Sequence, residues 1–138
     1  MFKQLFFLAL FAFLINLAWE VSHSLLYKTT TKMSVKEYVP RILRASGGDI
    51  IIIFIIFFAL SIINQSFNWN ILATQNLILS ILFGLILSIT IELLALSVQR
   101  WEYLPSMPLI PFINVGITPV LQMIITQIIT FFLTEHFI

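Results

Sequence analysis

Four stretches of this sequence are apolar over a length that can cross the hydrocarbon core of a bilayer. A transmembrane helix needs about 20 mainly apolar residues in succession, and residues 5–26, 45–63, 77–98 and 109–133 meet this condition. In lipid, a lone strand would leave its backbone groups without hydrogen-bond partners, so each stretch is predicted to be a helix. The expected fold is an all-α integral membrane protein, a four-transmembrane-helix bundle in which residues 1–138 form a single membrane domain.

The composition excludes several other classes of protein. Of the 138 residues, 60% are hydrophobic and 9% are charged, whereas about 25% of the residues of an ordinary soluble domain are charged. The formal net charge of +1 provides no field that would attract a nucleic acid, so no nucleic-acid partner is expected. The chain has no cysteine, which excludes disulfides, thiolate metal sites and cysteine nucleophiles.

Lysine and arginine in the short loops predict the orientation of the chain in the membrane. The loop near residues 64–70 carries no charge, and the third loop carries Arg100. The first loop carries most of the positive residues, namely Lys28, Lys32, Lys36, Arg41 and Arg44. The first and third loops are therefore expected in the cytoplasm, with both termini outside. Residues 34–43 of the first loop are expected to form a short helix at the interface.

Polar residues in the first and third spans fall on one face of each helix. The first span carries Asn16, Glu20, His23 and Tyr27 at spacings of four, three and four, and the third carries Gly84, Ser88, Glu92 and Gln99. At about 100° per residue, each set shares one side of its helix. Glu20 and Glu92 both lie eight residues before a positive residue, and thus about 12 Å from the charged end of their spans.

The second and fourth spans also begin with polar residues at the same end. The second opens with Ser46-Gly47-Gly48-Asp49, and the fourth carries Asn114 and Gln122. Pro111, Gly116 and Pro119 are expected to bend the fourth helix. The sequence therefore predicts a polar cavity in the cytoplasmic half and an outer half that is nearly featureless. Ionisable groups inside a span are costly and usually functional.

Each of these features also has a structural interpretation. Glu20 and Glu92 would stabilise the bundle by pairing with His23 and Arg100, and Asp49 would cap the second helix through a Ser-x-x-Asp pattern. Trp19, Trp101 and Tyr103 are typical of the aromatic belts at membrane interfaces. Gly84 between Ser80 and Ser88 is typical of a close contact between helices.

The motifs together resemble those of a widespread, functionally uncharacterised group of small four-span bacterial membrane proteins. They read Trp19-Glu20-x-x-His23-Ser24-x-Leu26-Tyr27, Gly48-Asp49, Glu92, Arg100-Trp101-x-Tyr103-x-x-x-Met107-Pro108 and Gly116-x-x-Pro119-x-x-Gln122. The resemblance covers most of the chain and brings no settled activity; the expected location is the cytoplasmic (inner) membrane. In residue types, but not in motif, the chain also resembles emopamil-binding-type sterol isomerases and membrane-bound terpene and lycopene cyclases.

We expect an enzyme that performs acid–base chemistry on a membrane lipid or lipophilic small molecule, such as isomerisation, cyclisation or hydration of an isoprenoid. A carboxyl group in an apolar wall can remain a proton donor near neutral pH. The candidate catalytic residues are Glu20, Glu92, His23 and Asp49. The candidate substrate-binding residues are Asn16, Trp19, Tyr27, Arg100, Trp101, Tyr103, Asn114 and Gln122. No cofactor and no metal site are expected.

Two other functions remain open on the sequence. A small oligomeric, proton-coupled transporter would use the embedded glutamate of the first span to exchange protons for its substrate. Confinement of the polar groups to one leaflet weighs against it, because a transport path needs polar steps through both halves. A non-catalytic accessory subunit would tolerate replacement of both glutamates and would co-purify with a larger partner. The sequence leaves a homo-oligomer open.

Overall fold

The computed structural model describes residues 1–138 and contains four helices that are long and apolar enough to cross a membrane. They are α1 (Phe2–His23), α3 (Val35–Ile63), α4 (Thr74–Ser97) and α5 (Ile117–Phe137). Two short helices follow α1, namely the 3₁₀ helix η1 (Ser24–Leu26) and α2 (Lys28–Thr31). The chain is thus a multi-pass membrane protein with a four-span helical bundle, which confirms the fold predicted from the apolar stretches.

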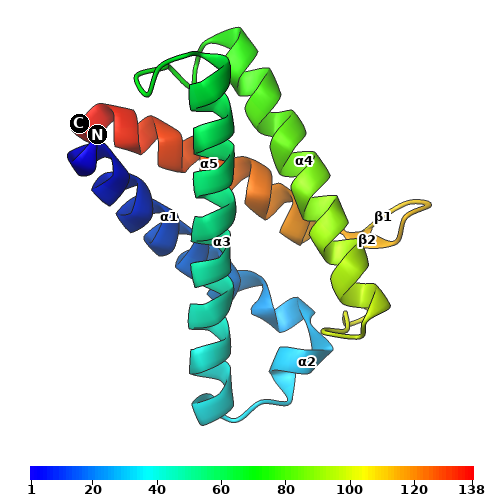
Figure 1. The fold of residues 1–138 in the computed structure, drawn as a ribbon. Coiled ribbons are helices and arrows are strands. Elements are labelled where there is room, and N and C mark those ends of the chain that lie inside the picture. Colours follow the sequence, from blue (N-terminus) through cyan, green and yellow to red (C-terminus); the bar gives the residue numbers. More distant parts are fainter.

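The four helices pack unevenly. α5 lies along both α1 and α4, and α1 also lies along α3, whereas α3 and α4 make far fewer contacts with each other. Figure 1 shows α3 and α4 meeting at the end where the 64–73 loop joins them and spreading apart toward their other ends. The apolar core fills the joined end, with Leu8, Leu60, Trp69, Ile71 and Phe131 among its buried members. The apolar core does not extend to the splayed end, where α3 and α4 spread apart.

Both termini lie at one end of the bundle (Figure 1). Lys3 Nζ donates to the Ile138 carbonyl oxygen at 3.3 Å, and the Ile71 N–H of the second loop donates to Glu135 Oε1 at 2.6 Å. At the other end, the first and third loops are joined by a 2.9 Å hydrogen bond from the Lys28 N–H to the Glu102 carbonyl oxygen. This confirms that the first and third loops share one side, and the cytoplasmic assignment of that side stays a prediction.

The second span begins earlier than residue 45. One continuous helix runs from Val35 to Ile63, so the separate interfacial helix predicted for residues 34–43 is wrong. Its start is fixed by a capping box, in which the Ser34 N–H donates to Glu37 Oε2 at 2.9 Å. Asp49 lies inside this helix, so its interpretation as a helix cap is also wrong.

The fourth span begins later than residue 109. Strands β1 (Leu109–Ile110) and β2 (Val115–Gly116) form an antiparallel hairpin, in which Leu109 pairs with Gly116. Asn114 sits in the turn with a φ of 53°, a left-handed conformation that asparagine tolerates better than most residues. α5 then starts at Ile117 with Pro119 in its first turn, where a missing N–H costs no helical bond. The predicted bend within the fourth helix is therefore replaced by a hairpin before it.

Small residues mediate the contact between α4 and α5, as the sequence pattern indicates. Gly84 faces Gln127 of α5, and Ser80 and Ser88, one turn to either side of it on α4, are both buried. A Cβ atom at Gly84 would lie 2.5 Å from Gln127 Nε2, so only glycine fits without a shift. Gln127 Nε2 donates to the Ser80 carbonyl oxygen at 2.6 Å, which ties the two helices together.

Polar side chains also occupy the end of the bundle where the core lies, so the prediction of a featureless outer half is wrong. Gln4, Asn76 and Thr130 are all buried there. Gln4 Nε2 donates to the Phe67 carbonyl oxygen at 2.7 Å and Asn76 Nδ2 to that of Asn70 at 2.8 Å. These bonds attach the second loop to the helices. The hydroxyl of Thr130 bonds to the backbone of its own helix.

Candidate functional site

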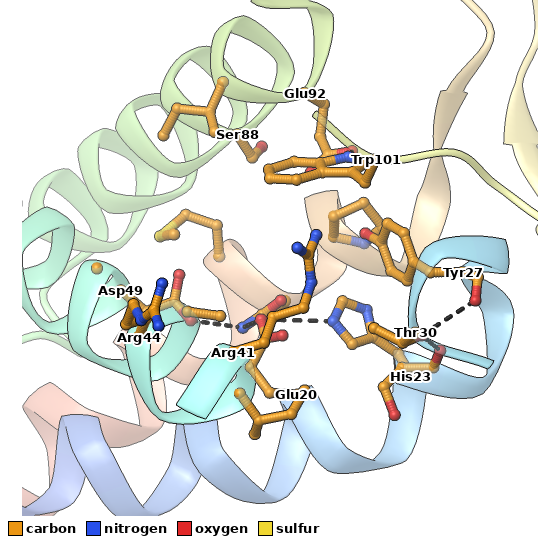
Figure 2. A pocket seen from close by; sticks show the side chains of 18 of the residues that line it. Glu20, His23, Tyr27, Thr30, Arg41, Arg44, Asp49, Ser88, Glu92 and Trp101 are labelled. Atoms are coloured by element: carbon orange, nitrogen blue, oxygen red, sulfur yellow. Dashed lines mark hydrogen bonds and ion pairs between the residues drawn. The ribbon is translucent and has the colours of Figure 1, made fainter. Parts of the chain in front are cut away.

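A cavity of about 350 Å³ lies at the end of the bundle where α3 and α4 spread apart. All four long helices contribute to its wall, together with residues of η1, α2 and the loop after α4. The four candidate catalytic residues all line it, namely Glu20, His23, Asp49 and Glu92 (Figure 2). The structure thus brings together side chains that the sequence places on three different spans.

Gln122 of α5 holds two of the carboxylates. Its Nε2 lies 2.9 Å from Glu20 Oε1, 2.9 Å from Asp49 Oδ2 and 3.2 Å from Asn16 Oδ1. An amide nitrogen carries two hydrogens, so Gln122 can serve only two of these three acceptors at once. Glu20 Oε1 and Asp49 Oδ2 each lie 2.9 Å from the same Gln122 nitrogen, so the two oxygens are separated by at most twice that distance. Two negative charges at such a separation repel each other in a water-poor wall.

Glu20 and His23 contact each other at the wall of the cavity. His23 Nε2 is 3.4 Å from Glu20 Oε1, while His23 Nδ1 is 3.3 Å from the hydroxyl of Thr118 on α5. The Thr118 hydroxyl is also 3.3 Å from Met107 Sδ, which connects the pair to the third loop.

Glu92 is held from the third loop. The Tyr103 hydroxyl and the Trp101 indole N–H, the latter at 3.2 Å, both donate to Glu92 Oε2. The same Tyr103 oxygen accepts the Gly116 N–H at 3.1 Å, so one side chain links α4, the loop and the hairpin. The predicted pairing of Glu92 with Arg100 does not form, because the two ion pairs of the protein involve other residues.

Aromatic rings cover one side of the cavity. Tyr27 contacts His23, Trp101 and Tyr103 edge to face, with ring centroids 5.2, 6.3 and 5.4 Å apart. Burial raises the pKa of the Tyr27 phenol, and burial followed by the hydrogen bond to Glu92 raises the pKa of the Tyr103 phenol. Both hydroxyls therefore stay protonated. Trp101 and Tyr103 are held against Glu92, which departs from their interpretation as interfacial belt residues.

The candidate substrate-binding residues divide into three groups. Four of them line the cavity, namely Tyr27, Arg100, Trp101 and Gln122. Asn16 and Tyr103 lie behind its wall and hydrogen-bond to residues that line it. Trp19 and Asn114 lie outside it: the indole N–H of Trp19 is buried without a partner, and Asn114 is exposed in the hairpin turn. The position of Asn114 gives no support to a role in substrate binding.

Two cavity residues that the sequence reasoning missed are Arg41 and Arg44, which it treats as loop charges. Both lie on α3 before Asp49. The sequence signal that could have found Arg41 is its helical spacing from Asp49. Counting back from Ile52 in steps of three or four reaches Asp49, Ala45 and Arg41, which share one face once the helix is known to begin at Val35. The other lining residues that were not among the candidate site residues are Ser24, Thr30, Ile42, Ala45, Gly48, Ile52, Ser88, Ile91, Pro119 and Met123.

The donor set of the cavity suits proton transfer. The structure groups no three His, Asp or Glu side chains in a way that would hold a metal ion. What the cavity offers is three carboxyl groups, one imidazole and the phenol of Tyr27, beside apolar side chains such as Ile52 and Ile91. Groups of these kinds act as general acids and bases when they are held within hydrogen-bond reach of a substrate.

Comparisons with protein-family models, with curated proteins and with solved structures find no match to this chain. Four long apolar helices remain consistent with a small four-span membrane protein. Any function assigned to the chain therefore rests on the geometry of the cavity.

Proposed function

We propose that the protein is a membrane-embedded enzyme that performs acid–base chemistry on a lipid or an isoprenoid. The observation that carries this proposal is the grouping of Glu20, His23, Asp49 and Glu92 around one cavity inside the spans. Ionisable side chains within a bilayer are costly and are generally found where function needs them. A volume of about 350 Å³ lies in the range of small-molecule sites.

In the proposed mechanism, Glu20 is the acid. Its contacts to His23 and Gln122 hold the carboxyl group at the cavity wall, and transfer of its proton to a carbon–carbon double bond forms a C–H bond and leaves a carbocation. The ring faces of Trp101 and Tyr27 stabilise the positive charge. No atom other than the proton has moved at this stage.

Glu92 is the proposed base. The hydrogen bonds from Tyr103 and Trp101 fix its orientation. Removal of a proton from a carbon next to the cation forms a new double bond, and the overall reaction is an isomerisation with no change in mass. Attack by a second double bond before proton loss gives cyclisation, and attack by water gives hydration. The cycle closes when Glu92 releases its proton and Glu20 takes one up, each by exchange with water at the mouth of the cavity, while Gln122 orients Glu20 and Asp49 through its hydrogen bonds.

The experiment is untargeted mass spectrometry of lipids from the native host, comparing the wild type with Glu20→Gln at equal expression. We expect one lipid to accumulate as another disappears, with a mass difference of zero for isomerisation or cyclisation and of one water for hydration. Glu135→Gln is the matched control, because Glu135 lies in α5 at the opposite end of the bundle and a glutamine can still accept the Ile71 N–H. Identical lipid profiles with a folded Glu20→Gln protein would argue against an enzyme.

A second candidate is a small proton-coupled transporter, and one observation favours it. The Ser80 and Thr126 hydroxyls and Gln127 Oε1 are buried without partners between the cavity and the opposite end. They offer polar steps that the sequence does not lead one to expect in the outer half. Proton-gradient-driven flux into liposomes, lost in Glu20→Gln, would distinguish transport from catalysis. An accessory subunit remains the third alternative, and tolerance of replacement at both Glu20 and Glu92 would identify it.

We also propose that the chain belongs to the group of four-span bacterial proteins that its motifs resemble, in the inner membrane with the first and third loops in the cytoplasm. The support is that separate motifs converge on one cavity. Glu20, Asp49, Glu92, Trp101 and Gln122 come from different motifs, and all of them line it. Accessibility of a cysteine introduced in place of exposed Lys32 or Gln75, tested from each side of the membrane, measures the orientation.

A further inference from the structure

Three arginines line the cavity beside the acid–base residues. Arg41 and Arg44 come from α3, and Arg100 follows α4. Arg44 and Arg100 are exposed and so mark the mouth, whereas Arg41 is half-buried. Figure 2 shows the Arg41 side chain extending across the cavity in the direction of Trp101.

None of these arginines forms an ion pair within the protein. The two ion pairs are His23 with Glu20 and Lys28 with Glu102. The carboxylates of the cavity are engaged by other donors, since Gln122 bonds to Glu20 and Asp49 while Tyr103 and Trp101 bond to Glu92. Three cations thus face a cavity without a partner, although Arg100 also lies over the Trp101 ring at 5.6 Å.

The lysines of the first loop show that the orientation of the chain in the membrane does not by itself require positive residues at the cavity. Lys32 and Lys36 are exposed and line no part of the cavity, yet they contribute equally to the positive charge of the first loop. Arginine differs from lysine in its planar fork of donors, which matches the oxygens of a phosphoryl group. Placement of arginines at the cavity and lysines outside it therefore indicates a ligand anion.

We propose that Arg41, Arg44 and Arg100 bind the phosphoryl headgroup of an amphiphile whose apolar chain extends toward the gap between α3 and α4. This inference rests on the proposed function, because it names the substrate class of the same cavity. A phosphoryl group carries up to two negative charges and accepts several hydrogen bonds at once, which suits a set of guanidinium groups better than a single carboxylate does.

The order of residues along α3 fits such a ligand. Arg41 lies nearest to the helix start, Asp49 about two turns further on, and apolar Ile52 about three turns beyond Arg41. Ile91 and Met123 add apolar surface from α4 and α5. A headgroup at the arginines thus places the first carbons of the chain beside the carboxyl groups, and the reacting double bond lies close to the headgroup.

The test measures binding to the purified full-length protein in a neutral maltoside detergent by native mass spectrometry. The probes are farnesyl diphosphate and phosphatidic acid, each compared with the same apolar chain lacking the phosphoryl group, namely farnesol and diacylglycerol. Inorganic diphosphate is the third comparison. Whichever phosphorylated amphiphile binds identifies the source of the headgroup as an isoprenoid or a membrane lipid.

We expect at least one phosphorylated amphiphile to bind about tenfold or more tightly than its unphosphorylated counterpart and than inorganic diphosphate. Arg41→Gln and Arg44→Gln should each weaken binding about tenfold, and Arg44→Lys should weaken it less, because the charge remains while the fork is lost. Lys36→Gln is the matched control on α3, with the same change in charge outside the cavity. It should bind as the wild type does.

Failure of binding to either phosphorylated amphiphile, or equal binding by the wild type and folded Arg44→Gln, would overturn the headgroup assignment. Equal binding of farnesol or of inorganic diphosphate would overturn it as well. The proposal of an enzyme is tested separately. It would be contradicted if Glu20→Gln left the lipid profile of the host unchanged. Glu20→Gln should still bind the amphiphile, because the arginines are unchanged.

Discussion

Replacement of Gly84 by alanine tests whether the α4–α5 contact positions the two sides of the cavity. The new Cβ would lie 2.5 Å from Gln127 Nε2 and 3.4 Å from the Met123 carbonyl oxygen, so the Gln127 amide must move. That movement breaks the 2.6 Å bond to the Ser80 carbonyl oxygen. Gln127 is fully buried and its Oε1 has no partner, so loss of this bond takes away the one hydrogen bond that its side chain makes.

The expected loss in the free energy of unfolding is about 1 to 4 kcal/mol. A hydrogen bond between membrane helices contributes about 0.6 to 1.7 kcal/mol, and crowding of a packed interface costs about 1 to 3 kcal/mol. Alanine returns about 1 kcal/mol through its better helix propensity. The balance is a net destabilisation, because steric crowding at Gly84 exceeds the gain in propensity.

The assay is unfolding in mixed micelles by titration with sodium dodecyl sulfate, followed by circular dichroism. Gly47→Ala is the matched control, because no atom lies within 4 Å of a Cβ there and the substitution is otherwise the same. It should leave stability unchanged or raise it by up to about 1 kcal/mol. A Gly84→Ala protein as stable as the Gly47→Ala protein would refute the steric role assigned to this contact.

The double mutant Gly84→Ala/Gln127→Ala distinguishes crowding against Gln127 from a general destabilisation of α4 by the alanine. Shortening Gln127 to alanine removes the atom that the new Cβ would meet. Gly84→Ala should therefore cost much less in a Gln127→Ala background than in the wild type, since the two changes act on the same contact. Equal costs in both backgrounds would place the defect elsewhere.

The remaining predictions concern the cavity and an exposed ion pair between the first and third loops. Gln122→Leu should lower conversion of the lipid substrate at least about tenfold while the protein stays folded, because Glu20 and Asp49 lose their shared donor; unchanged turnover would exclude a positioning role. Tyr103→Phe removes the hydroxyl that donates to Glu92 and should lower kcat more than it raises KM in a turnover assay. Glu102→Gln breaks an exposed ion pair and should change stability by less than about 1 kcal/mol in the detergent titration.

The number and pairing of the spans follow from the sequence because lipid permits few alternatives. An apolar stretch without partners must be a helix, and short loops force neighbouring spans to run in opposite directions. The boundaries depend on finer signals. Charges and Pro40 make residues 35–45 look like a loop, yet the Ser34–Glu37 capping box starts the helix there. The apolar residues 109–116 look like part of a span, and only pairing of Leu109 with Gly116 shows a hairpin.

The candidate site is predictable to the extent that helical periodicity and depth determine it. Glu20 and His23 share a face of one helix, and depth places Glu92 level with Glu20, so their convergence follows from the sequence. The contact of Gln122 with both Glu20 and Asp49 does not follow, because it depends on how α1, α3 and α5 pack together. Arg41 is missed for a different reason, since a residue assigned to a loop has no predicted face.

The uneven packing of the bundle explains how four helices can contain a polar cavity at all. The buried apolar residues Leu8, Leu60 and Phe131 gather at the end where α3 meets α4, and this core stabilises the whole molecule. At the other end α3 and α4 are free to separate, and Gln122, Tyr103 and the third loop organise the polar groups that they expose. Stability and chemistry thus depend on different ends of the same helices. Substitutions in the core should lower the unfolding free energy, and substitutions at the splayed end should mainly change ligand binding and turnover.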